Sequence, residues 1–209
     1  MADGFHKPTK FPSRMFEAFH GGDDPAHLSR VAHETANALI ARVRDDPDPA
    51  VVERLVAYTD EHGIDALAEL WSQASARSLP GALWRIYLLR LLIRQDPTGT
   101  SFLFQRGTEV AVGVDPVVAG APTPTGPDEV VALADDILRG IFAGDFGIAL
   151  DRAAAFCRIM SLGATSLADD ADASEPDRST ELTTRALRFS ELGQELGACA
   201  RLWRSDSLD

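Results

Sequence analysis

Apolar residues recur with a period of about 3.6 along nearly every long segment of this 209-residue chain, which predicts amphipathic helices. Only Val110, Val112 and Val114 alternate with the period of two that a strand requires. The pattern therefore predicts an all-α protein, a compact bundle of about seven or eight helices. The main helices are expected at residues 24–44, 49–62, 64–74, 79–95, 127–141, 146–168 and 179–204, with short ones at 13–20 and 98–107.

The segment 79–95 is apolar around its whole circumference apart from its arginines. A helix of this character is usually buried, so we expect it to be the central helix of the bundle. Ser78 is its expected N-cap residue, and Asp96 followed by Pro97 should end it. The segment 127–141 instead predicts a single apolar face, formed by Val130, Leu133, Ala134, Ile137, Leu138 and Ile141.

The distribution of prolines and glycines suggests how the chain is organised. Residues 1–20 are expected to form an N-terminal arm, either flexible or docked, and residues 21–209 a helical domain. The segment 113–127 reads as the longest loop and as a subdomain boundary. It contains three glycines together with Pro116, Pro122, Pro124 and Pro127.

The charge of the chain limits its partners. Twenty basic residues stand against 32 acidic ones, giving a net charge of −12, so binding to nucleic acid or to an anionic membrane is disfavoured. The acidity is mainly C-terminal: the net charge is −3 over residues 1–100 and −9 over residues 101–209. We therefore expect the contact surface in the N-terminal half. Two cysteines and the lack of a long apolar run indicate a cytoplasmic protein without a membrane span.

Several residue clusters resemble metal or catalytic motifs only in part. Residues 170–181 have oxygen-bearing side chains at EF-hand spacing, but Glu175 stands where that loop needs glycine. Glu17 and His20 match one half of a di-iron motif, and no second copy exists in the sequence. Nucleophile elbows and phosphate-binding loops are also missing from the sequence. We therefore expect no metal and no cofactor, and the sequence favours a non-enzymatic protein without deciding the matter.

Five arginines, at positions 77, 85, 90, 94 and 106, make one region locally basic. On a mostly buried helix, arginines more often pair with carboxylates of neighbouring helices than face nucleic acid. We expect such pairs here. A DNA- or RNA-associated regulator remains a third reading of this region.

The strongest indication of a binding function is the aromatic N-terminal arm. Four of the ten phenylalanines, Phe5, Phe11, Phe16 and Phe19, lie within it among Lys7, Lys10 and Arg14. Aromatic side chains of this kind are typical anchors in protein interfaces. We therefore predict an interaction or regulatory protein that binds another protein through the arm or through a groove beside the helix at 79–95, and homo-oligomerisation stays open. The alternative is a small-molecule-binding protein or enzyme with a pocket near Trp84, Tyr87 and Arg90.

Three sequence runs carry a resemblance: GIDALAELW at 63–71, LPGALWRIYLLR at 79–90 and AAAFCR at 153–158. They resemble a family of actinobacterial all-helical proteins without an assigned activity, some members of which carry the label RNA polymerase beta subunit. The resemblance would extend over most of the chain and implies a helical packing. It rests on packing residues and brings no catalytic motif with it.

Overall fold

The fold is all-helical in a computed structural model that describes residues 25–45, 70–113, 115–122 and 125–209. Within these ranges the chain forms seven helices and a helical end at 70–72, with no strand among them. The predicted all-α fold is therefore confirmed. The helices are α2 (Pro25–Asp45), α5 (Leu79–Gln95), α6 (Pro97–Val110), α7 (Asp115–Ala119), α8 (Pro127–Ala143), α9 (Phe146–Ala171) and α10 (Pro176–Arg204).

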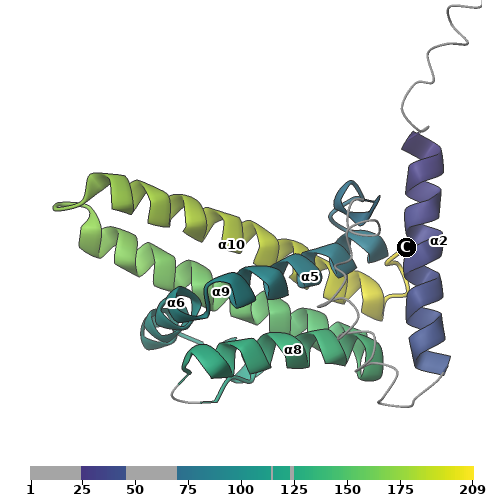
Figure 1. Ribbon diagram of the computed structural model, residues 1–209, viewed down its shortest axis with the longest axis horizontal. Coiled ribbons are helices and arrows are strands. Elements are labelled where there is room, and N and C mark those ends of the chain that lie inside the picture. Colours follow the sequence, from purple (N-terminus) through teal and green to yellow (C-terminus); the bar gives the residue numbers. More distant parts are fainter. Residues whose placement is uncertain (1–24, 46–69, 114, 123–124) are drawn as a thin grey trace, which may run out of the picture.

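The centre of the bundle is α9. It runs beside α10 over most of its length and also contacts α6, α7 and α8 (Figure 1). The expected central position of the helix at 79–95 is therefore wrong, because this helix, α5, packs mainly on α8 and α2 and leaves Leu91 and Leu92 exposed. Small residues explain the difference, since the run Ala153, Ala154 and Ala155 in α9 is fully buried and lets neighbouring helices approach from several sides.

Two glycines allow α6 and α9 to touch through their backbones. A Cβ atom added at Gly163 would lie 2.0 Å from the carbonyl oxygen of Leu103, and one added at Gly107 would lie 2.0 Å from the carbonyl oxygen of Ile159. No side chain larger than hydrogen fits at either position without moving a helix. The crossing of α6 over α9 is therefore fixed by these two residues.

The ends of α5 follow the sequence prediction. The Ser78 hydroxyl accepts a hydrogen bond from the backbone N–H of Gly81 at 3.3 Å and so caps the helix. Asp96 ends α5 and at the same time caps α6, where its carboxylate accepts from the N–H of Gly99 at 2.9 Å. Because this cap places Pro97 in the first turn, α6 is longer than the predicted helix at 98–107.

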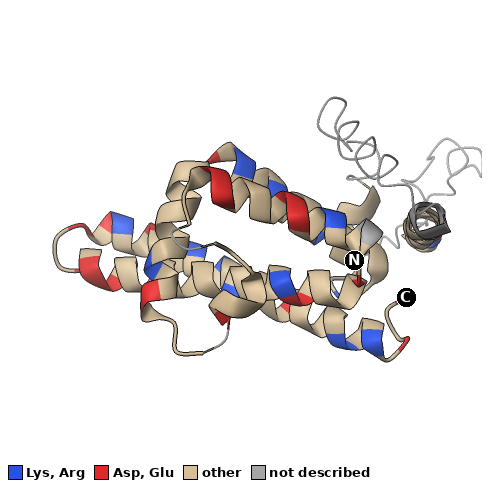
Figure 2. Ribbon diagram, turned by 90° about the horizontal axis from the view of Figure 1, so that it is seen from below, with Lys and Arg blue, Asp and Glu red and all other residues tan. Residues whose placement is uncertain are grey.

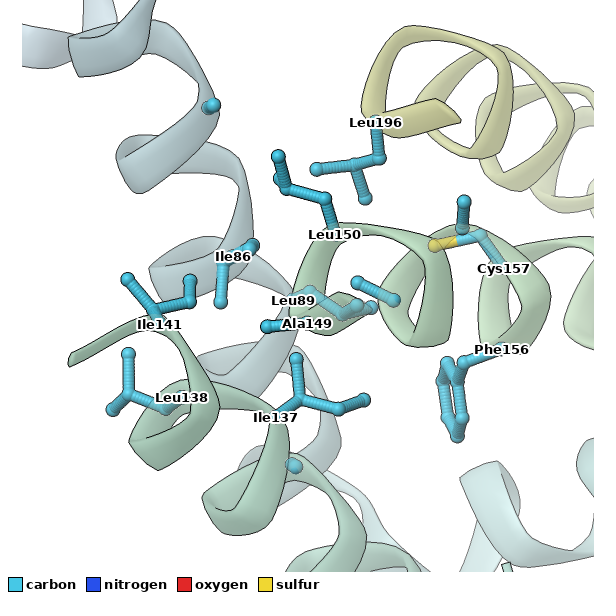
Figure 3. Close-up of a cluster of buried hydrophobic side chains, with 14 of the residues drawn as sticks. Ile86, Leu89, Ile137, Leu138, Ile141, Ala149, Leu150, Phe156, Cys157 and Leu196 are labelled. Atoms are coloured by element: carbon cyan, nitrogen blue, oxygen red, sulfur yellow. The ribbon is translucent and has the colours of Figure 1, made fainter. Parts of the chain in front are cut away.

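The helix predicted at 127–141 is confirmed as α8, and its whole predicted apolar face is buried. This face meets α5 and α9 in the core, where Ile137 and Ile141 lie close to Ile86 and Leu89 (Figure 3). Its polar side carries Asp135, which forms an ion pair with the buried Arg90 of α5. The α5–α8 contact therefore combines apolar packing with one inward-facing charge pair.

The acidic segment between α9 and α10 forms a short turn. α9 extends to Ala171, and α10 begins at Pro176, three residues earlier than the predicted helix at 179–204, because Glu175 and Pro176 start the helix. The segment 113–127 contains the short helix α7, which packs on α9. Helices on both sides of this segment share one core.

At the other end of the bundle, α2 packs on α5 and α8 through Ala32, Ala36 and Ile40, and confirms the helix predicted at 24–44. The Trp71 indole N–H donates to the Thr35 hydroxyl at 3.1 Å. The predicted helices at 13–20 and 49–62, and most of the one at 64–74, lie outside the described residues. Across the described helices, none is long and apolar enough to span a bilayer.

Candidate functional site: a groove between α5 and α10

A groove of about 1090 Å³ lies between α5 and α10 on the described part of the molecule. Its floor is apolar and consists of side chains from both helices. The side chains that form this floor are Trp84, Leu88, Leu89, Leu92 and Ile93 from α5 and Phe189 and Leu192 from α10. Leu92 is 43% exposed, so a large apolar side chain faces solvent inside the groove.

The two helices run in opposite directions and are tied together at one end. There the N–H of Leu79 donates to the main-chain oxygen of Asp209 at 2.6 Å, and Arg85 Nε lies 2.5 Å from a carboxylate oxygen of Glu195. At the other end, Gln95 of α5 and Asp177 of α10 line the groove. The ion pair of Arg85 with Glu195 lies in the groove wall near the tied end.

The rim of the groove is charged and mostly acidic. Apart from the pair of Arg85 with Glu195, four carboxylates and two arginines line it, which leaves two negative charges in excess. The carboxylates are those of Asp96, Asp177, Glu181 and Glu191, and the basic side chains are those of Arg185 and Arg188. Arg185 lies over the ring of Phe189, with its guanidinium carbon 5.9 Å from the ring centroid.

Of the three residues predicted to form a pocket, only Trp84 lines the groove. Its ring centroid lies 6.0 Å from that of Tyr87, which belongs to the same helix. Arg90 lies elsewhere: its side chain is only 4% exposed, and its Nε is 2.7 Å from a carboxylate oxygen of Asp135. The structure therefore assigns Arg90 to the helix packing and separates it from Trp84.

Arg94 and Arg106 of this basic region also meet acidic partners, as predicted. Arg94 lies 3.4 Å from Asp135, and Arg106 lies 2.9 Å from Asp170 of α9. Acidic and basic positions are interspersed along the described helices (Figure 2). The arginines of α5 and α6 thus act in packing between helices.

The phenylalanines predicted to bind a partner, Phe5, Phe11, Phe16 and Phe19, lie outside the described residues. Sequence reasoning expected a groove beside the helix at 79–95 but did not identify α10 as its second wall. The apolar circumference of α5 is the sequence signal for a groove beside this helix, because a surface helix with this pattern must present one apolar face to something other than the core.

The acidic residues near 170–181 have structural roles. Asp170 pairs with Arg106, and Glu175 lies 3.3 Å from Arg178. Among the residues that the structure describes, no group of three or more His, Cys, Asp or Glu side chains is placed to hold a metal ion.

Both cysteines are buried and unpaired. Burial raises the pKa of the Cys157 thiol well above its ordinary value and raises that of Cys199 to about 11. The Cys199 thiol donates to the carbonyl oxygen of Ala76 at 3.3 Å. Both thiols are therefore held in the protonated form, which is a poor nucleophile.

The runs that carry the resemblance to actinobacterial helical proteins occupy packing positions. The run at 79–90 forms most of α5, and Ala153 to Cys157 are buried in α9. Most of the run at 63–71 lies outside the described residues. Searches of protein-family models, curated proteins and solved structures found no match to this chain.

Proposed function

We propose that the protein is a non-enzymatic interaction protein that binds an amphipathic helix of another protein in the groove between α5 and α10. The observation that carries this proposal is the apolar floor of the groove, with Leu92 43% exposed beneath a charged rim. Helix-in-groove recognition requires such a surface, because the apolar face of the bound helix replaces solvent over the floor.

The dimensions of the groove favour a helix over a small ligand. The walls are helices of 17 and 29 residues, so the groove is long as well as open to solvent. An elongated and open apolar surface matches the stripe that an amphipathic helix presents.

The charge of the rim defines the polar face of the partner. Four carboxylates against two arginines favour a helix that carries Lys or Arg beside its apolar stripe. The contribution of these charges should appear mainly in the association rate and in its salt dependence, because the rim stays solvated. The apolar floor should supply most of the affinity.

Substitution of Leu92 provides the test. Leu92→Arg places a charge in the floor and should weaken partner binding by roughly 30-fold, which corresponds to about 2 kcal/mol for a central interface residue. Leu187→Arg is the matched control, because Leu187 is 59% exposed and does not line the groove. Both changes lie at exposed positions, so folding should be kept.

The assay is affinity purification from the native host with mass spectrometry, followed by binding measurements with the purified candidate. A protein retained by the wild type and by the Leu187 variant, but lost with the Leu92 variant, supports the proposal. Equal retention by all three would refute it.

The small-molecule alternative draws less support, because Tyr87 and Arg90 do not line the groove with Trp84. Two buried, unpaired thiols fit the reducing compartment that we propose for the protein, the cytoplasm.

A further inference from the structure

We infer that the groove between α5 and α10 is occupied, in the absence of a partner, by the chain's own N-terminal segment 1–20, so that a partner must displace this segment. The inference rests on the proposed function, because it treats the segment as an internal version of the helix that the groove receives. It identifies the occupant by three properties: apolar side chains, charge and tethering.

The apolar side chains of segment 1–20 match the floor of the groove. The segment holds four phenylalanines, and the spacing of Met15, Phe16 and Phe19 would put these side chains on one face of a helix. The floor offers an aromatic ring at each side, Trp84 on α5 and Phe189 on α10, with leucines between them. Phenylalanine and methionine side chains are enriched at the cores of protein interfaces, so they suit such a floor.

The charges are also complementary. Segment 1–20 contains Lys7, Lys10 and Arg14 against two acidic residues, in a chain whose overall net charge is −12. The groove rim has two negative charges in excess after its internal ion pair is set aside. Segment 1–20, with one positive charge in excess, is therefore attracted to the acidic rim of the groove. This attraction is strongest at low salt.

Tethering makes the contact intramolecular. Twenty-four residues precede Pro25, the first residue of α2, and an extended chain of that length reaches up to about 80 Å. α2 packs on α5, so the tether starts from a helix that contacts one wall of the groove. A short tether gives an effective concentration in the millimolar range, on the order of 1 mM, so even a weak contact is well populated.

The lysines allow a direct test in the full-length protein. Lys7 and Lys10 are the only lysines of the chain, and both lie in segment 1–20. A zero-length carbodiimide reagent joins an amine to a carboxylate in direct contact, so lysine cross-links mapped by mass spectrometry report where the segment lies. The rim carboxylates of Asp177, Glu181 and Glu191 are exposed and should react.

We expect cross-links from either lysine to the rim to be about tenfold more abundant than cross-links to Asp128 and Asp136, because tethering to the groove concentrates the amines there. These two residues are exposed reference carboxylates on α8 and do not line the groove. The cross-linked product should be monomeric. Mixing isotope-labelled and unlabelled chains would give no mixed cross-links.

Two sets of variants test the apolar contact. Leu92→Arg should lower the rim cross-links about tenfold, as expected for loss of a central interface contact, whereas Leu187→Arg should leave them unchanged. Phe16→Ser combined with Phe19→Ser should lower them as well, without any change in the described helices.

Cross-links to the reference carboxylates in equal amount, or mixed cross-links between chains, would overturn the inference. If the rim cross-links appear but no partner depends on Leu92, the proposed function and the displacement by a partner fail, while the occupancy of the groove by segment 1–20 stands. If a partner depends on Leu92 but the rim cross-links are absent, the inference alone fails.

Discussion

The contact between α6 and α9 leads to the sharpest prediction about stability. Gly163→Ala adds one Cβ atom 2.0 Å from the Leu103 carbonyl oxygen and 2.9 Å from the backbone nitrogen of Gly107. Both atoms belong to the backbone of α6, so neither can turn aside as a flexible side chain would. Because ordinary carbon–oxygen contacts begin above roughly 3 Å, α6 must move away from α9 by more than about 1 Å. The whole α6–α9 contact is then loosened.

The expected effect is the balance of two terms. Overpacking of a close contact costs about 1–3 kcal/mol, and the upper end applies here because the obstacle is backbone. Alanine improves on glycine inside a helix by about 1 kcal/mol. The net loss in the free energy of unfolding should therefore be about 2 kcal/mol. For a protein of this size, that corresponds to a fall in Tm of roughly 4–8 °C.

Urea unfolding followed by circular dichroism measures this change directly. Gly197→Ala is the matched control, since it makes the same substitution in the long helix α10. Its added Cβ would meet Arg201 Nη1 at 3.7 Å and the Cβ of Ala154 at 3.9 Å, both ordinary contacts. This variant should gain about 0.5–1 kcal/mol from helix propensity. If Gly163→Ala were as stable as the wild type, or if both variants shifted in the same direction, the direct backbone contact of α6 with α9 would be refuted.

Two further predictions concern buried groups. Asp135→Asn removes the charge that faces the buried Arg90 and should lower the free energy of unfolding by about 3 kcal/mol. Asp136→Asn is the control, because its pair with Arg139 is exposed, and it should change the free energy of unfolding by less than about 1 kcal/mol. Equal effects of the two substitutions in urea titrations would contradict the burial of the Arg90–Asp135 pair. Burial raises the pKa of Cys199 from 9.0 to about 11, so the native state keeps a proton that the unfolded state loses. Cys199 should therefore lower stability between pH 9 and 11 by at most about 2–3 kcal/mol, and the buried Cys157 adds a decrease of the same sign. Cys199→Ala should lack the Cys199 part of the decrease. Identical pH profiles for this variant and the wild type would show that the native Cys199 thiol titrates normally.

The sequence predicts best those helices whose apolar residues form a single face. In α8 the predicted face is the buried face, because a stripe on an otherwise polar helix can be buried in one orientation only. For α5 this reasoning is insufficient. Apolar residues on all sides indicate that every side is covered, but they do not identify what covers each side. The structure places one side against α8 and α2 and leaves Leu92 in an open groove.

The identity of the central helix also depends on features that periodicity does not capture. Gly163 and the alanines of α9 are only weakly hydrophobic, so a pattern of apolar residues does not show how important they are for packing. Their importance is steric, because they set how closely two backbones approach. Which partner a glycine faces depends on tertiary contacts between segments more than 50 residues apart in the chain, as with Leu103 and Gly163.

The groove changes the meaning of the charge distribution. Most acidic residues lie in the C-terminal half of the sequence, and the simplest interpretation of this distribution is a solvated surface that keeps the protein soluble. In the structure, part of that acidity lies on α10, facing the apolar residues of α5, and Arg85 and Glu195 join the two halves across 110 positions. Expecting a contact surface in the N-terminal half alone therefore leaves out one wall of the groove. The acidic half supplies the charge that would select a basic helix, and the apolar half supplies the surface on which that helix would lie.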